Sequence, residues 1–128
     1  MAMEPHGMVL VVDDDDSMRE AIERLLGAAG FTSAGYASAE ALLAGGGIGN
    51  ALCIISDIKL PAMSGLDLLT ELRRLGLVTP VIIITAHDSA AVRNDAKLHG
   101  ATAYLAKPFM SRALLAAIDG IARTVTSP

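Results

Sequence analysis

The chain has 128 residues and a net charge of −4, with 52% hydrophobic and only 3% aromatic residues. This length predicts one domain with a core of its own, and that core must be aliphatic. The chain has no basic run, which argues against nucleic acid as its own partner, because binding to phosphates needs clustered lysines and arginines.

The sequence predicts no membrane association, because no apolar stretch approaches the ~20 residues of a membrane-spanning helix. Residues 1–7 have neither the basic start nor the apolar run of a signal peptide. Cys53 lies in an apolar run and is the only cysteine, so we interpret it as a small core residue. A lone cysteine is typical of a reducing compartment, and we therefore expect a cytoplasmic protein.

The first predicted element is a strand at 8–12, a continuous aliphatic run of the kind found in central parallel strands. Ser17 and Glu20 have the spacing of a capping box, which predicts a helix from there to about Gly30. The strand predicted at 32–36 is short and interrupted by a glycine, which favours an edge position in the sheet.

A second, short helix is predicted from Ser38 to about residue 44. The glycine-rich segment 45–49 lacks the Gly-Lys-Ser/Thr ending of a phosphate-binding loop, so we interpret it as a flexible connection. A strand at 52–56 and a helix at 65–75 follow, and the leucine stripe of that helix is expected to face inward as far as Leu75.

The remaining predicted elements are a strand at 81–85, a helix at 88–99, a strand at 102–106 and a helix at 110–123. The helix at 88–99 has a poor apolar face, to which we assign Leu98. The alternation of strands and helices predicts a doubly wound α/β fold with five parallel strands. We expect one domain at 8–123, a flexible tail at 1–7, and at 124–128 a second tail or the start of a linker.

Polar residues stand where four of the predicted strands end. Asp13 and Asp14 follow the first strand and Asp57 follows the third, while Thr85 ends the fourth and Lys107 follows the fifth. Because the carboxyl ends of parallel strands meet in one crevice, we expect these side chains to form one site.

Three neighbouring carboxylates repel one another unless a cation joins them. Oxygen ligands favour Mg²⁺, with Mn²⁺ as the alternative ion, and the sequence has no His/Cys cluster for zinc. A carboxylate beside Mg²⁺ can attack a phosphoryl group, and Lys107 and Thr85 can neutralise and hydrogen-bond the phosphoryl oxygens. The sequence therefore predicts a Mg²⁺-dependent phosphoaspartate.

Four stretches, at 11–15, 57–65, 84–86 and 107–109, together resemble the response-regulator receiver domains of two-component signalling. The resemblance spans about 8–122. Within this family, the chain is similar to receivers that precede a helix-turn-helix output domain. The resemblance implies a flavodoxin-like (βα)5 fold with strand order 2-1-3-4-5.

The resemblance also implies a role for each site residue. Asp57 is the expected phosphoacceptor and a metal ligand, Asp14 a direct metal ligand, and Asp13 a ligand that acts mainly through a metal-bound water. The backbone carbonyl of Lys59 is the further expected ligand. Tyr104 is expected to change rotamer as Thr85 moves, although an aromatic residue there is also explained by packing alone.

The partners implied are a histidine kinase or phosphotransfer protein, and a second copy of the chain bound through the fourth helix, fifth strand and fifth helix. A DNA-binding output domain is expected if the chain is part of a longer protein. We expect no enzyme with a separate substrate, only self-catalysed phosphotransfer and dephosphorylation. Two alternatives stay open: an interaction module independent of phosphorylation, and a Mg²⁺-dependent phosphatase. Such phosphatases usually carry a second acid where this chain has Lys59.

Overall fold

Five short strands form one parallel sheet in the computed structural model, which describes residues 7–126. The strands are β1 (Met8–Val12), β2 (Thr32–Tyr36), β3 (Cys53–Asp57), β4 (Val81–Thr85) and β5 (Ala103–Ala106). Their order is β2-β1-β3-β4-β5, which confirms the predicted doubly wound topology and the edge position of β2. β3 and β5 each start one residue later than predicted.

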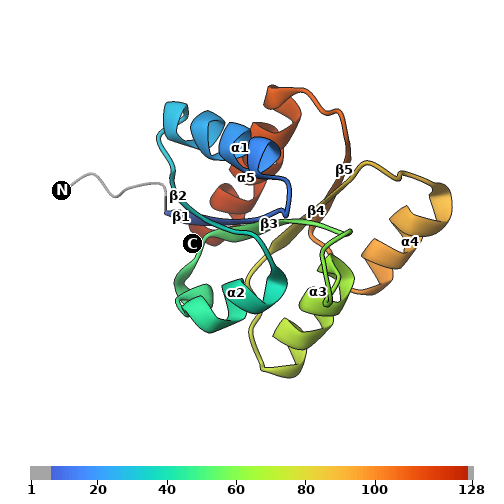
Figure 1. Ribbon diagram of the computed structural model, residues 1–128. Coiled ribbons are helices and arrows are strands. Elements are labelled where there is room, and N and C mark those ends of the chain that lie inside the picture. The colour runs from blue at the N-terminus through green and yellow to red at the C-terminus, as the bar shows by residue number, and fades with distance from the viewer. Residues whose placement is uncertain (1–6, 127–128) are drawn as a thin grey trace.

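Helices cover both faces of this sheet (Figure 1). They are α1 (Asp16–Ala28), α2 (Ala39–Gly45), α3 (Gly65–Arg74), α4 (Ala90–Leu98) and α5 (Ser111–Thr126), with a short 3₁₀ turn, η1 (Ile48–Asn50), before β3. α1 and α5 pack on one face, and α2, α3 and α4 pack on the other. None of the helices within 7–126 is long and apolar enough to cross a membrane.

The core consists of two aliphatic layers, because successive side chains of a strand point to opposite faces of the sheet. On β3, Ile55 faces the layer shared with α1 and α5, while Ile54 faces the layer shared with α2, α3 and α4. Cys53 is fully buried, as expected of a core residue, and burial raises the pKa of its thiol to about 12.

Three sequence-based details of the helices are wrong. The N-cap of α1 is Asp15, whose side chain accepts a hydrogen bond from the Met18 amide, so Ser17 lies inside the first turn. Leu75 is 51% exposed because it lies just past the end of α3. Leu98 is 75% exposed because α4 turns Ala96 toward the sheet instead.

The ends of the predicted domain are only partly described. α5 continues to Thr126, past the predicted end at 123, so 124–126 are helical. Residues 1–6 and 127–128, which include most of the first predicted tail and the end of the second, lie outside the described residues. Within the predicted flexible connection, Ile48 is buried, and its carbonyl accepts a hydrogen bond from the Thr79 hydroxyl at 2.8 Å.

Gly65 allows the loop after β3 to close tightly. It is the first residue of α3, directly after the N-cap Ser64, and its amide donates to the Ile58 carbonyl at 2.9 Å. A Cβ at this position would collide with the backbone carbonyl of Asp57. The absence of a side chain therefore lets the start of α3 pack against the end of β3.

We predict that Gly65→Ala lowers the free energy of unfolding by ~1–3 kcal/mol, because backbone atoms cannot move aside as a flexible side chain can. Gly27→Ala is the matched control, since a Cβ there meets no atom within 4 Å. Gly27 lies in a helix, so this variant should gain about 0.5–1 kcal/mol. Urea denaturation measures both variants, and a neutral Gly65→Ala would contradict the close packing.

Candidate functional site

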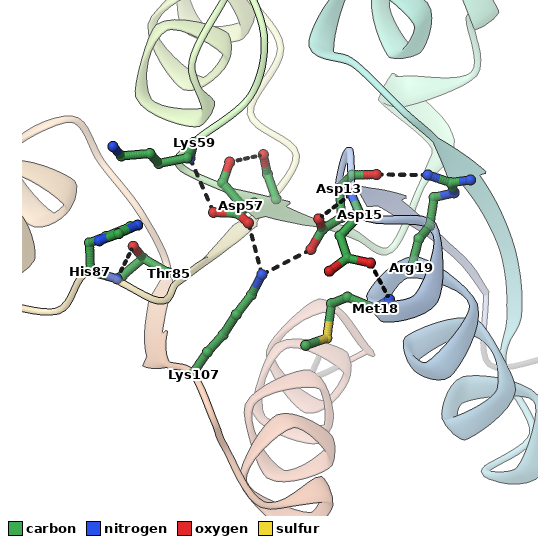
Figure 2. Close-up of polar contacts among 10 residues, drawn as sticks. Asp13, Asp15, Met18, Arg19, Asp57, Lys59, Thr85, His87 and Lys107 are labelled. Carbon is green, nitrogen blue, oxygen red and sulfur yellow. Dashed lines mark hydrogen bonds and ion pairs between the residues drawn. The ribbon is translucent and has the colours of Figure 1, made fainter.

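The register of the sheet aligns the carboxyl ends of the strands that carry the predicted site. The last pairs at this edge include Val12 with Ser56 and Thr85 with Ala106. Asp13, Asp57 and Lys107 directly follow Val12, Ser56 and Ala106 in the chain. Their side chains converge on one point above the sheet edge (Figure 2).

Three carboxylates come together at this point. One oxygen from each of Asp13, Asp14 and Asp57 lies within 4.8 Å of the other two. Asp13 is fully buried and Asp57 is 7% exposed, while Asp14 is exposed to solvent. An all-oxygen set that is open to water on one side fits Mg²⁺, which keeps several water ligands when it binds protein carboxylates. The residues present therefore fit the predicted cation.

Lys107 joins the two buried carboxylates. Its Nζ lies 2.8 Å from Asp57 Oδ2 and 3.1 Å from Asp13 Oδ2, and its side chain is 13% exposed. Burial alone would lower the pKa of Lys107, but the hydrogen bonds to Asp57 and Asp13 outweigh it and the pKa is raised. Lys107 is therefore a stable positive charge at the centre of the cluster.

Asp13 is an acid in an unfavourable place. Burial raises its pKa above the ordinary value, and the hydrogen bonds from the Asp15 amide and from Lys107 only partly offset this effect. The nearby charge of Asp57 raises it further. The site thus holds more negative charge than its own lysine compensates, which is the condition under which a divalent cation binds.

The loops after β3 and β4 fold back onto the same edge. The Lys59 amide donates to Asp57 Oδ1 at 3.1 Å, whereas the Lys59 side chain is exposed and extends away from Asp57 (Figure 2). Thr85 is 1% exposed, and its hydroxyl oxygen accepts a hydrogen bond from the His87 amide at 3.0 Å. Each loop is thereby tied to a residue of the predicted site.

The hydrogen bond of Tyr104 is to a carboxylate outside the cluster of Asp13, Asp14 and Asp57. Its hydroxyl donates to Asp88 Oδ1 at 2.8 Å, and the Arg93 guanidinium lies 5.4 Å from the centre of its ring. Arg93 also forms an ion pair with Asp88 at 3.0 Å. Burial and the hydrogen bond to Asp88 raise the pKa of Tyr104. Tyr104 thus fastens β5 to the loop after β4 and to α4.

Two residues at the site were not predicted from the sequence. The Ser56 hydroxyl is buried and donates to the Asp57 carbonyl at 2.9 Å, and a serine in an otherwise apolar strand was the available signal. Arg19 donates to the Asp13 carbonyl at 2.8 Å. Its helical spacing from Asp16 indicates the ion pair between them, at 2.6 Å, but not the contact with the backbone.

Comparison with known proteins agrees with this fold. Residues 9–119 match the family described as the response regulator receiver domain. The chain is 38% identical to the transcriptional regulatory protein FixJ of Azorhizobium caulinodans over 110 residues, which covers 86% of this chain and 52% of FixJ. It is 40% identical to the regulator NtrC of Salmonella typhimurium over 103 residues, which covers 80% of this chain and 22% of NtrC.

Solved structures give the same result. A Francisella response regulator receiver domain superposes with a TM-score of 0.88 at 28% identity and covers 94% of this chain and 99% of its own. The structure titled FixJ-N gives 0.84 at 29% identity and covers 98% of this chain and all of its own. The chain thus spans about half the length of FixJ but the whole of this FixJ fragment.

The raised pKa of Asp13 predicts a dependence of stability on pH. The folded protein holds this proton more tightly than the unfolded chain, so ionisation of Asp13 costs stability once the pH rises above about 3.8. We predict that Asp13→Asn is more stable than wild type at pH 7 in EDTA, and that the difference shrinks as the pH falls toward that value.

Thermal unfolding with and without Mg²⁺ measures this prediction. Mg²⁺ at ten times its Kd should stabilise wild type by about 1.4 kcal/mol and should stabilise Asp13→Asn less at the same concentration. A variant that is less stable than wild type at pH 7 in EDTA would show that Asp13 is well accommodated as an anion.

Proposed function

The chain belongs to the response regulator receiver domain family, and on this premise we propose that it accepts a phosphoryl group on Asp57 in a Mg²⁺-dependent reaction. The observation that carries the proposal is the position of Asp57, which lies against Asp13 and Asp14 and within 2.8 Å of the Lys107 ammonium. This arrangement combines a nucleophilic carboxylate oxygen with the positive charges, from Lys107 and a bound cation, that phosphoryl transfer requires.

In the proposed reaction, a carboxylate oxygen of Asp57 attacks the phosphorus of a phosphohistidine. A P–O bond forms, the P–N bond breaks, and the imidazole nitrogen leaves with the electron pair. Mg²⁺ held by Asp14, Asp57, the Lys59 carbonyl and, through water, Asp13 would neutralise charge on the phosphoryl oxygens.

Lys107 would move its contact from the Asp57 carboxylate to a phosphoryl oxygen, for which its present position is suited. The Thr85 hydroxyl would donate a hydrogen bond to another phosphoryl oxygen. Both residues stand at the same sheet edge as Asp57, so these changes need local movement only.

We propose that the loop at 86–89 carries the signal to α4. Thr85 accepts from the amide of His87, and Tyr104 donates to Asp88, so both residues proposed to switch hold this one loop. A shift of Thr85 toward a phosphoryl group would pull on the loop. α4 is a suitable responder because Ala96 is its one buried residue, so few packing contacts oppose its movement.

A histidine kinase or phosphotransfer protein is the proposed donor, and a second copy of the chain is the proposed partner for the face formed by α4, β5 and α5. On this face Leu98 is exposed, and Arg93, Lys97 and Tyr104 line a cavity of about 280 Å³. A cytoplasmic location and the absence of a separate enzymatic substrate are further parts of the proposal. If the chain is part of a longer protein, a DNA-binding output domain is the proposed recipient of the signal.

We predict a single phosphoryl adduct, stable in acid and labile in base, when the chain is mixed with Mg²⁺ and a small phosphodonor. Intact-mass spectrometry detects it, and Asp57→Asn should abolish it. Asp67→Asn is a matched control, because Asp67 lies in the first turn of α3, where its carboxylate accepts a hydrogen bond from the amide of the N-cap Ser64. Absence of the adduct in wild type would favour the phosphorylation-independent module. Steady turnover of small phosphoesters would favour a phosphatase.

We predict that Tyr104→Phe loosens α4 in the unphosphorylated protein. The variant keeps the ring beside Arg93 but loses the hydrogen bond to Asp88, which is worth ~1 kcal/mol, so amide exchange over 86–98 should rise about fivefold. Tyr36→Phe, which changes the other tyrosine of the chain, is the control. Equal exchange in Tyr104→Phe and wild type would exclude this hydrogen bond as a restraint on α4.

A further inference from the structure

The backbone of Asp13 is held more firmly than a strand end requires. Its amide donates to the Tyr36 carbonyl at 3.1 Å, and its own carbonyl accepts from Arg19 at 2.8 Å. Its side chain accepts from the Asp15 amide at 2.9 Å as well as from Lys107. Arg19, which is not one of the three clustered carboxylates, restrains the backbone of Asp13 through this hydrogen bond (Figure 2).

The Arg19 side chain is confined along its length. It is 17% exposed, far less than its ion-pair partner Asp16 at 76%. A Cβ on Gly35 of β2 would collide with the Glu23 carboxylate and would lie 3.0 Å from Arg19 Cδ, so the glycine leaves space for both side chains. The two ends of the guanidinium have different acceptors, the Asp13 carbonyl and the Asp16 carboxylate. This arrangement is more specific than an ordinary surface ion pair.

The hydrogen bond from Arg19 to the Asp13 carbonyl also affects the position of Asp14. The Asp13 carbonyl belongs to the peptide plane that joins Asp13 to Asp14, so fixing this oxygen fixes the direction in which the chain enters Asp14. Asp14 is exposed, and packing does not hold its side chain. The repulsion among the three carboxylates would otherwise favour a turn that carries Asp14 away from Asp57.

We propose that Arg19 is a positioning residue for the cation site. It acts through the Asp13 carbonyl and holds the turn between β1 and α1 in the conformation that brings Asp13 and Asp14 to the cation. This inference rests on the proposed function, because it assumes that the carboxylates bind Mg²⁺.

The direction of the change in affinity separates positioning from a simple charge effect. If Arg19 contributed only its positive charge, its removal would strengthen the binding of a cation nearby. If it positions the turn, its removal weakens binding. Calorimetric titration of Mg²⁺ into the protein measures this directly and does not depend on phosphorylation.

We expect Arg19→Gln to weaken Mg²⁺ binding about five- to tenfold, the size of one ordinary net hydrogen bond. The rate of adduct formation at saturating Mg²⁺ should return to within about twofold of wild type, since Arg19 does not touch Asp57. Arg19→Lys should be intermediate, because one ammonium lacks the planar fork that reaches two acceptors. The Mg²⁺ affinity of Arg19→Lys also tests the positioning role if Arg19→Gln does not fold.

Arg24→Gln removes the same charge from an exposed position of the same helix and should leave the Mg²⁺ affinity within about twofold of wild type. Unchanged or tighter binding in folded Arg19→Gln would overturn the inference, as would an equal loss in Arg24→Gln. Failure of wild type itself to bind Mg²⁺ would instead refute the proposed function, so the two failures are distinguishable.

Discussion

The function proposed for this fold depends on the ion pairs of Lys107 with Asp13 and Asp57. Two carboxylates that are almost fully excluded from water lie side by side, and one lysine from the end of another strand contacts both. Burial of like charges is unfavourable. The two carboxylates nevertheless stay together because the sheet holds the ends of β1 and β3 in register. The site is therefore a strained part of an otherwise apolar and well-packed fold.

This strain has a functional meaning. In the proposed function, the uncompensated negative charge would favour binding of a divalent cation, and the cation and Lys107 would together stabilise a phosphoryl group on Asp57. A signal would leave the site through neighbouring residues that contact a weakly packed helix. Thr85 and Tyr104 hold the same loop, and α4, which follows this loop, buries little of its own surface. The proposed mechanism thus combines strands that hold the site residues in place with a weakly packed helix that can move.

The sequence predicted the convergence of the carboxylates and the lysine, because aliphatic runs that end in polar residues place these residues at one edge of a parallel sheet. The strand order was implied only by the resemblance to receiver domains, and the structure has that order. The sequence failed where two local choices were close in energy. Aspartate and serine are equally good N-caps, so nothing in the sequence favoured Asp15 over Ser17. Periodicity does not reveal where a helix stops, which is why Leu75 was misplaced. The apolar stripe of α4 is too weak to indicate which face is buried, which is why Leu98 was misplaced. Contacts with backbone carbonyls, such as that of Arg19, have no signature in a sequence.

The most direct test of the shared cation site is a crystal structure of the chain grown with Mn²⁺, with anomalous diffraction used to locate the metal. The account predicts one strong anomalous peak at coordination distance from carboxylate oxygens of Asp14 and Asp57, with Lys107 still beside Asp57. A peak located elsewhere, or no peak while the three aspartates keep the arrangement described above, would contradict it.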